Sequence, residues 1–225
     1  MNLTKINGGK DPEMNDWQNA STQVFWGEIA PCEHVLQIYE NDEAFIDLLY
    51  GFVSDGLRAG ECVITIGTTP HLKVLNERLR AGGFDVFGLS LHGQYIPLDA
   101  EETLSEFMIN GWPDENLFRH VIGSLVARGR KQKRPVRAFG EMVAILWSQG
   151  HAGATVRLEH LWNDFLKTES ISLYCAYPKS GFTENALESM ANICGSHSKM
   201  IATKGDFPQE MQYKQTMAPR ATGAI

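Results

Sequence analysis

Short apolar segments alternate with amphipathic helices along most of this chain, and this alternation constrains the fold more than any other feature. Residues 61–66 form a continuous apolar run of the kind that is buried on both faces of a sheet. A helix with Leu72, Leu75 and Leu79 on one face follows it. Because right-handed crossovers place helices on both faces of a parallel sheet, the pattern predicts an α/β three-layer sandwich with a mostly parallel central sheet.

The same alternation sets the expected elements and the domain bounds. Strands are expected at residues 34–39, 61–66, 94–98, 136–139 and 171–177. Helices are expected from Asp42 to about Gly60, through Leu72–Leu79, over about 101–110, through Leu117–Leu125, over about 142–149, through Leu158–Leu166, and from Leu187 to His197, with a weak hairpin-like stretch at 84–91. We interpret residues 26–202 as one domain between a flexible arm, 1–25, and a flexible tail, 203–225.

Charge and composition exclude several classes of function. The net charge of −7 argues against direct nucleic-acid binding, which needs a basic surface. No apolar run approaches the roughly 20 residues that span a bilayer, and no signal peptide is recognisable, so we expect a cytoplasmic protein without membrane contact. The four cysteines show no Cys-x-x-Cys spacing, so neither disulfides nor a structural zinc site is expected.

Polar side chains follow several of the expected strands, and this placement defines the candidate site. The carboxyl ends of parallel strands meet at one rim of the sheet, where α/β proteins bind ligands. Glu141 lies in the turn Phe139-Gly140-Glu141-Met142 between a strand and a helix. The candidate ligand-binding residues are His34, Tyr39, Glu40, Thr68, Thr69, His71, Asp99, Glu141, Met142, Trp147, Glu159, Trp162, Asn163 and Tyr177.

Glu141 and Glu159 each have more than one possible role. Glu141 could act as a general base, bind a ligand, or be the buried partner of Arg137 or Arg157. Glu159 has Trp162 and Asn163 as helical neighbours; the group could line a polar notch, but a buried hydrogen-bond network joining the helix to the sheet is favoured.

The sequence lacks the usual marks of phosphate, metal or covalent chemistry. No Gly-x-x-x-x-Gly-Lys-Ser/Thr segment follows any expected strand, and the turn at residues 39–43 is acidic, with Asn41 or Asp42 expected to cap the next helix. The histidines lack metal-binding spacing, and the least implausible trio, His34, His71 and Glu141, is disfavoured. No nucleophile elbow is present. We therefore expect no cofactor, no metal and no catalytic residue.

A series of motifs resembles the MEDS domain, the sensory domain of methanogen and methylotroph proteins grouped around a dichloromethane-responsive repressor. The motifs are His34-x-x-x-x-Tyr39-Glu40, residues 55–61 (Asp-Gly-Leu-x-Ala-Gly-Glu), 98–104 (Leu-Asp-Ala-Glu-Glu-Thr-Leu), 111–114 (Gly-Trp-Pro-Asp), 139–143 (Phe-Gly-Glu-Met-Val), 158–163 (Leu-Glu-x-Leu-Trp-Asn) and 173–178 (Leu-Tyr-Cys-Ala-Tyr-Pro). The resemblance implies a RecA-like or KaiC-like core without a working phosphate loop, used to sense small organic molecules. Neither tail is long enough for an output domain, so the repressor function is not carried over.

The leading hypothesis is a non-catalytic cytosolic sensory domain. It binds a small organic molecule at the rim and signals through a separate signalling or regulatory protein, or through self-association as a homodimer. One alternative is a degenerate RecA/KaiC-like nucleotide-binding protein or NTPase in which Glu141 orients water. Another is a structural interaction module without a ligand.

Overall fold

A single parallel sheet forms the centre of the computed structural model, which describes residues 33–131, 133–181 and 192–202. The strand order is β3-β2-β6-β7-β1-β8, and every adjacent pair is parallel. The strands are β1 (His34–Tyr39), β2 (Cys62–Gly67), β3 (Tyr95–Asp99), β6 (Val136–Gly140), β7 (Ile171–Pro178) and β8 (Lys199–Ala202). β1, β2 and β6 are buried along their whole length, as expected for strands covered on both faces.

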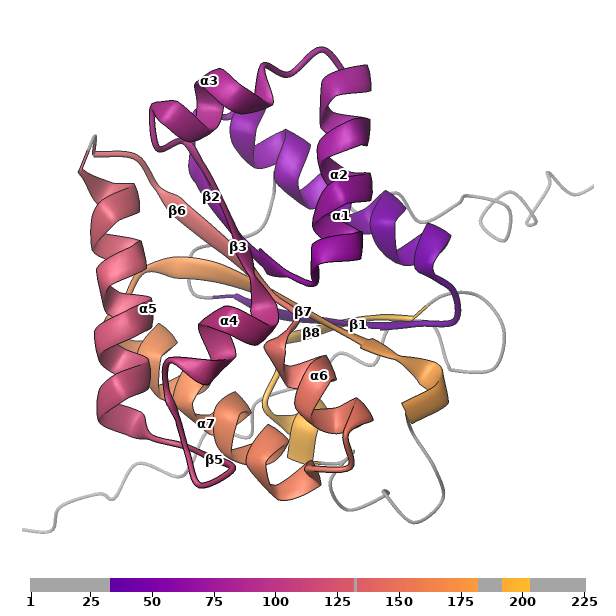
Figure 1. Ribbon diagram of the computed structural model, residues 1–225, viewed down its shortest axis with the longest axis vertical. Helices are drawn as coiled ribbons and strands as arrows, with labels where there is room; N and C mark the ends of the chain where they lie inside the picture. Colours follow the sequence, from indigo (N-terminus) through magenta and orange to yellow (C-terminus); the bar gives the residue numbers. More distant parts are fainter. Residues whose placement is uncertain (1–32, 132, 182–191, 203–225) are drawn as a thin grey trace, which may run out of the picture.

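Helices cover the sheet in two layers (Figure 1). One layer contains α1 (Asp42–Arg58), α2 (Thr69–Ala81) and α3 (Val86–Leu91), and the other contains α4 (Ala100–Ser105), α5 (Glu115–Arg130), α6 (Met142–Ser148) and α7 (Ala152–Thr168). Each layer has its own apolar core, one around Phe45, Phe52 and Phe139 and the other around Phe118 and Trp162. The three-layer α/β sandwich predicted from the alternation is therefore confirmed.

Local hydrogen bonds explain where the helices begin. The Asn41 side chain accepts a hydrogen bond from the Ala44 backbone N–H at 2.9 Å, which confirms Asn41 as the cap of α1. Asp99 caps α4 and Asp114 caps α5 in the same way. Pro70 lies in the first turn of α2, where a missing N–H costs nothing.

Two local predictions are wrong. The expected hairpin-like stretch at residues 84–91 contains helix α3, which Asp85 caps by accepting from the Gly88 N–H at 3.0 Å. The expected helix over 101–110 ends at Ser105. A short hairpin follows it, with β4 (Met108–Ile109) paired antiparallel to β5 (Trp112–Pro113).

The hairpin has a clear physical cause. Asn110 and Gly111 both have positive φ values, 51° and 77°, as a two-residue hairpin turn requires. An Asn-Gly pair supplies such a turn at low cost, and it ends the helical pattern.

The end of the chain departs from the prediction in one further way. β8 adds a sixth strand beside β1 that the five-strand prediction lacks. In the expected final helix, Leu187 and Met190 lie outside the described residues, Ile193 is helical and His197 lies past the helix end. The expected arm, 1–25, and the expected tail, 203–225, lie outside the described residues. Across the described ranges, no helix combines the length and the apolar character needed to cross a bilayer.

Candidate functional site

Glu141 lies between β6 and α6, at the carboxyl end of the sheet. Its backbone N–H donates to the Ile66 carbonyl of β2 at 2.9 Å, which fixes the turn against the neighbouring strand. Its carboxylate accepts from the Thr68 backbone N–H at 2.8 Å and contacts His71 Nδ1 at 2.7 Å. With only 4% of the residue exposed, Glu141 holds the first turn of α2 against the rim.

His71 is the electrostatic centre of this rim cluster, which we define as Tyr39, Asp42, Thr68, His71 and Glu141. The hydrogen bond to Glu141 raises the pKa of His71, with further support from the charges of Glu141 and Asp42, while partial burial opposes the shift. Asp42 lies 3.9 Å from the other ring nitrogen, Nε2. The arrangement favours an imidazolium held between two carboxylates.

Aromatic rings form the inner wall of the rim cluster. The ring of Phe45 lies edge-on to His71, with centroids 4.9 Å apart, and stacks on Tyr39 at 4.7 Å. Burial raises the pKa of the Tyr39 phenol, and the charge of Glu141 adds to the effect. The Tyr39 hydroxyl therefore stays neutral and is available as a hydrogen-bond group beside the carboxylates.

Asp99 and Thr69 extend the rim toward β3. The Thr69 hydroxyl donates to Asp99 Oδ2 at 2.6 Å, and Asp99 Oδ1 accepts from the backbone N–H groups of Glu101 and Glu102 at 2.9 and 3.0 Å. These bonds lower the pKa of Asp99, the Thr69 hydroxyl contributing most. One ionised carboxylate thus joins the first turns of α2 and α4.

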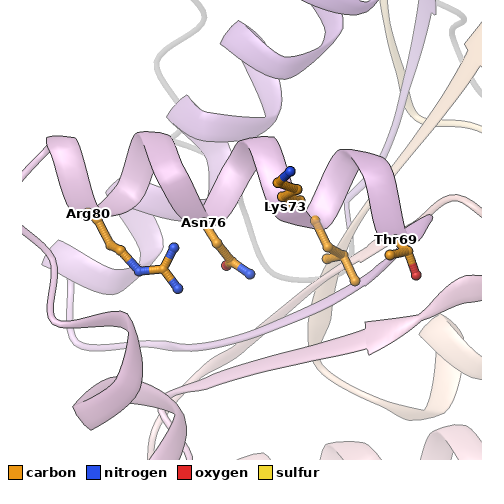
Figure 2. Close-up of a pocket in the computed structure, with 5 residues that line it drawn as sticks. Thr69, Lys73, Asn76 and Arg80 are labelled. Atoms are coloured by element: carbon orange, nitrogen blue, oxygen red, sulfur yellow. The ribbon is translucent and has the colours of Figure 1, made fainter.

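A shallow hollow of about 340 Å³ begins at Thr69 and continues along α2 (Figure 2). Its lining residues are Thr69, Leu72, Lys73, Asn76 and Arg80. Only Thr69 was among the sequence candidates. The other four lie 3, 4, 7 and 11 residues after Thr69, which is the spacing of one helical face, so that spacing was the signal that could have found them.

Neither predicted arginine partner of Glu141 is correct. Arg137 pairs with Glu61 and donates to the Phe52 carbonyl at 3.0 Å, while Arg157 pairs with Glu115 at 3.1 Å. Glu141 instead has a histidine partner. The sequence readings of Glu141 as a ligand-binding carboxylate or a general base remain predictions.

A second polar group lies inside the other helical layer. We define the buried cluster as His34, Glu159, Cys175 and His197, whose potential ligand atoms all lie within 4.8 Å of one another. Glu159 Oε2 is 3.6 Å from Nε2 of both histidines, and His34 Nε2 is 3.3 Å from Cys175 Sγ. All four side chains are buried, so the cluster is closed to solvent.

Burial controls the protonation of this cluster. It raises the pKa of Glu159 to about 8, lowers that of His34 to about 4 and lowers that of His197 well below its usual value. The Tyr177 hydroxyl donates to Glu159 Oε1 and partly offsets the effect on the carboxyl. All of these groups are therefore neutral near pH 7 in the absence of another charge.

The structure divides the predicted site in two. Tyr39, Thr68, Thr69, His71, Asp99 and Glu141 lie at the rim, and Glu40 is close to it, paired with Lys179 at 2.7 Å. The prediction of one shared rim is wrong for a second group, whose members lie in the core or in the buried cluster, or, in the case of Asn163, against His34 of that cluster. This group is His34, Met142, Trp147, Glu159, Trp162, Asn163 and Tyr177. The disfavoured metal trio is also not assembled, because His34 lies apart from His71 and Glu141. The buried network predicted around Glu159 is present.

A family model matches most of the chain. Residues 33–193 match the family model described as MEDS, the methanogen/methylotroph, DcmR sensory domain. No curated protein matches the chain.

Structure comparison gives distant similarities. A KaiC-like protein from the hyperthermophilic archaeon Pyrococcus horikoshii is 12% identical, with a TM-score of 0.54 over 76% of this chain and 72% of its own. A second P. horikoshii protein is 11% identical, with a TM-score of 0.51 over 79% of this chain and 85% of its own. The flagellar accessory protein FlaH from Methanocaldococcus jannaschii is 12% identical, with a TM-score of 0.49 over 77% and 72%. At these identities the first two similarities show a shared fold and nothing more.

Proposed function

The chain belongs to the MEDS family of sensory domains, and from this premise we propose that it binds a small organic molecule at the rim without catalysing a reaction. The observation that carries the proposal is the Glu141–His71 pair. One nearly buried carboxylate holds both the imidazole of His71 and the backbone N–H of Thr68, the residue just before α2. A ligand that competes for either bond would act directly on the position of α2.

The charges at the rim indicate the class of ligand. Asp42, Asp99 and Glu141 give the rim an excess of negative charge, and Asn41 already caps the N-terminus of α1. A polyphosphate would be repelled there, whereas a neutral or cationic molecule would be accepted. Lys73 and Arg80 lie farther along the hollow, so the two ends together suit a small polar molecule.

Helix α2 supplies a route by which binding could change a protein contact. Only Leu75 and Leu79 of this helix are buried, so few of its side chains pack against the core. At its far end α3 exposes Phe87 and Leu91, at 79% and 73%, four residues apart on one helical face. We propose that ligand binding shifts α2 and thereby changes the contact that α3 makes with a separate regulatory protein or with a second copy of the chain, in the cytoplasm.

Thermal unfolding with one-carbon and methylated probes tests the proposal. Methanol, trimethylammonium and dichloromethane are suitable probes because the family description names methylotrophs and methanogens. A ligand at one hundred times its Kd raises the free energy of unfolding by about 2.7 kcal/mol, so binding should appear as a clear rise in Tm. The shift should vanish in Glu141→Gln and persist in Glu77→Gln, a control on the exposed side of the same helix.

A shift that survives in Glu141→Gln and in His71→Ala would contradict the site. Magnesium-ATP in the same assay distinguishes the second candidate, a degenerate RecA/KaiC-like nucleotide-binding protein or NTPase, which the KaiC-like fold favours. A rise in Tm with magnesium-ATP, together with turnover lost in Glu141→Gln, would replace the sensory proposal by the enzymatic one.

A further inference from the structure

We propose that the buried cluster is a closed four-ligand site for a divalent transition-metal ion, with Zn²⁺ as the best match. Its ligands are His34 Nε2, His197 Nε2, Cys175 Sγ and one oxygen of Glu159. This site is separate from the rim and does not depend on the proposed ligand binding there.

The spacing of the ligand atoms fits a tetrahedral ion. Zinc bonds to nitrogen, oxygen and sulfur are about 2.0–2.3 Å long, which places the ligands of a tetrahedral site about 3.3–3.8 Å apart. The His34–Cys175 separation is 3.3 Å, and both histidine nitrogens lie 3.6 Å from Glu159 Oε2. These three distances between ligand atoms therefore already match those of a tetrahedral zinc site.

In both histidines Nδ1 makes a hydrogen bond outside the cluster, which leaves Nε2 free to bind a metal. His34 Nδ1 lies 3.2 Å from the Ser196 carbonyl and 3.1 Å from Asn163 Oδ1, and His197 Nδ1 lies 2.6 Å from the Ile193 carbonyl. Because a carbonyl only accepts, each Nδ1 carries the proton and each Nε2 has a lone pair facing the cluster. Metal-binding histidines are usually oriented by this kind of outer contact.

A metal-free hydrogen-bond network would leave this cluster incomplete. Among the described residues, Glu159 Oε2 and His197 Nε2 are fully buried and have no hydrogen-bond partner. Buried polar atoms of this kind are rare because no new hydrogen bond replaces the ones they lose to water. Both atoms point to the same centre as the sulfur of Cys175, so one cation would satisfy all of them.

The donor set selects the kind of ion. Two imidazoles, a thiolate and a carboxylate suit Zn²⁺ and related ions of intermediate softness, whereas Ca²⁺ and Mg²⁺ prefer oxygen ligands alone. Four protein ligands leave no open position for substrate, which is typical of a structural site.

The proposed ion would join parts of the chain that are far apart in sequence. His34 begins β1, Cys175 lies in β7 and Glu159 in α7, while His197 lies two residues before β8. The ion would therefore fix the segment leading into β8 against the sheet. Metal binding would stabilise the edge where β8 pairs with β1.

Metal analysis of the full-length chain tests the site. Protein purified without chelator from zinc-supplemented medium should contain one zinc per chain by mass spectrometry. After removal of zinc, Co²⁺ should bind at one equivalent, with the intense visible absorption of a tetrahedral ion and a near-ultraviolet thiolate band. The Co²⁺ form of Cys175→Ser should lack the near-ultraviolet thiolate band. Cys62→Ser, which removes a buried thiol elsewhere in the sheet, should retain it.

Graded variants separate a metal ligand from a structural residue. His197→Gln should weaken Co²⁺ binding by more than about 100-fold, and Asn163→Ala by about 10-fold, since it only orients His34. Folded wild-type protein that takes up no stoichiometric zinc or cobalt would overturn the proposal, whatever the variants do. A thiolate band that persists in Cys175→Ser would also overturn it.

Discussion

The rim cluster and the buried cluster contain the same pairing, a glutamate with a histidine, yet they favour opposite protonation states. At the rim, His71 Nδ1 lies 2.7 Å from Glu141 and the pKa of His71 is raised. In the buried cluster, His34 Nε2 is 3.6 Å from Glu159, the pKa of the histidine falls to about 4 and that of the glutamate rises to about 8.

Burial and hydrogen bonding decide the difference. His71 is partly open to solvent and gains a direct hydrogen bond to a carboxylate, which outweighs its desolvation. His34 and Glu159 are fully buried, and the separation between them is too long for a hydrogen bond, so desolvation dominates. The same two residue types thus make a charged, partly exposed pair in one layer and a neutral group in the other.

Replacing the glutamate should lower the free energy of unfolding more in the buried cluster than at the rim. Glu159→Ala leaves a cavity and removes the carboxylate that accepts from the Tyr177 hydroxyl, so we expect a loss of about 3 kcal/mol in the free energy of unfolding. Glu141→Ala should lower the free energy of unfolding by about 1–2 kcal/mol, because water can replace the lost carboxylate. Urea unfolding in the presence of EDTA measures both, and a larger loss for Glu141→Ala would break the comparison.

The charged histidine should give the rim a pH dependence of its own. The pKa of His71 is raised in the folded state. Its contribution to the free energy of unfolding is therefore complete below the unfolded pKa of about 6.5 and is lost as the pH rises through the folded pKa. Asp42 and Glu141 are the acidic groups that face it. At pH 5.5 we expect His71→Gln to cost roughly 1–2 kcal/mol in the free energy of unfolding.

Urea unfolding at pH 5.5 and pH 8.5 checks this prediction. The difference between the wild type and His71→Gln should shrink at the higher pH. His160→Gln, which removes an exposed histidine of α7, should show no such change. A His71→Gln difference that stays constant or grows with pH would mean that His71 is not the charged member of the rim cluster.

The fold was largely predictable because it depends on local patterns. The apolar run at 61–66 and the spacing of Leu75 and Leu79 are properties of neighbouring residues, and both became buried elements. The hairpin at Asn110-Gly111 was missed although its turn signal is local and strong. The short strand β8 was missed because four residues give too little periodicity.

The candidate site was less predictable because it depends on which face each residue occupies. Cys175 and Tyr177 lie two residues apart in β7 and therefore share one face, toward α7, whereas the rim lies at the strand ends. Alternation along β7 could have assigned Tyr177 to that layer. The meeting of His34 with His197 could not be predicted, because it depends on how two distant segments pair across the sheet.

The smallest expected effect concerns the edge of the rim, where Thr69 donates to Asp99. Thr69→Val removes this hydroxyl but leaves Asp99 its two backbone bonds at the start of α4. Since the pair is exposed, the free energy of unfolding should fall by only about 0.5 kcal/mol. The pKa of Asp99 should rise, because the lost bond is the largest cause of its depression. NMR titration of the Asp99 carboxyl measures that rise, with Ser105→Ala as the control. An unchanged Asp99 pKa would show that backbone bonds alone hold this carboxylate, and that α2 and α4 are not joined through it.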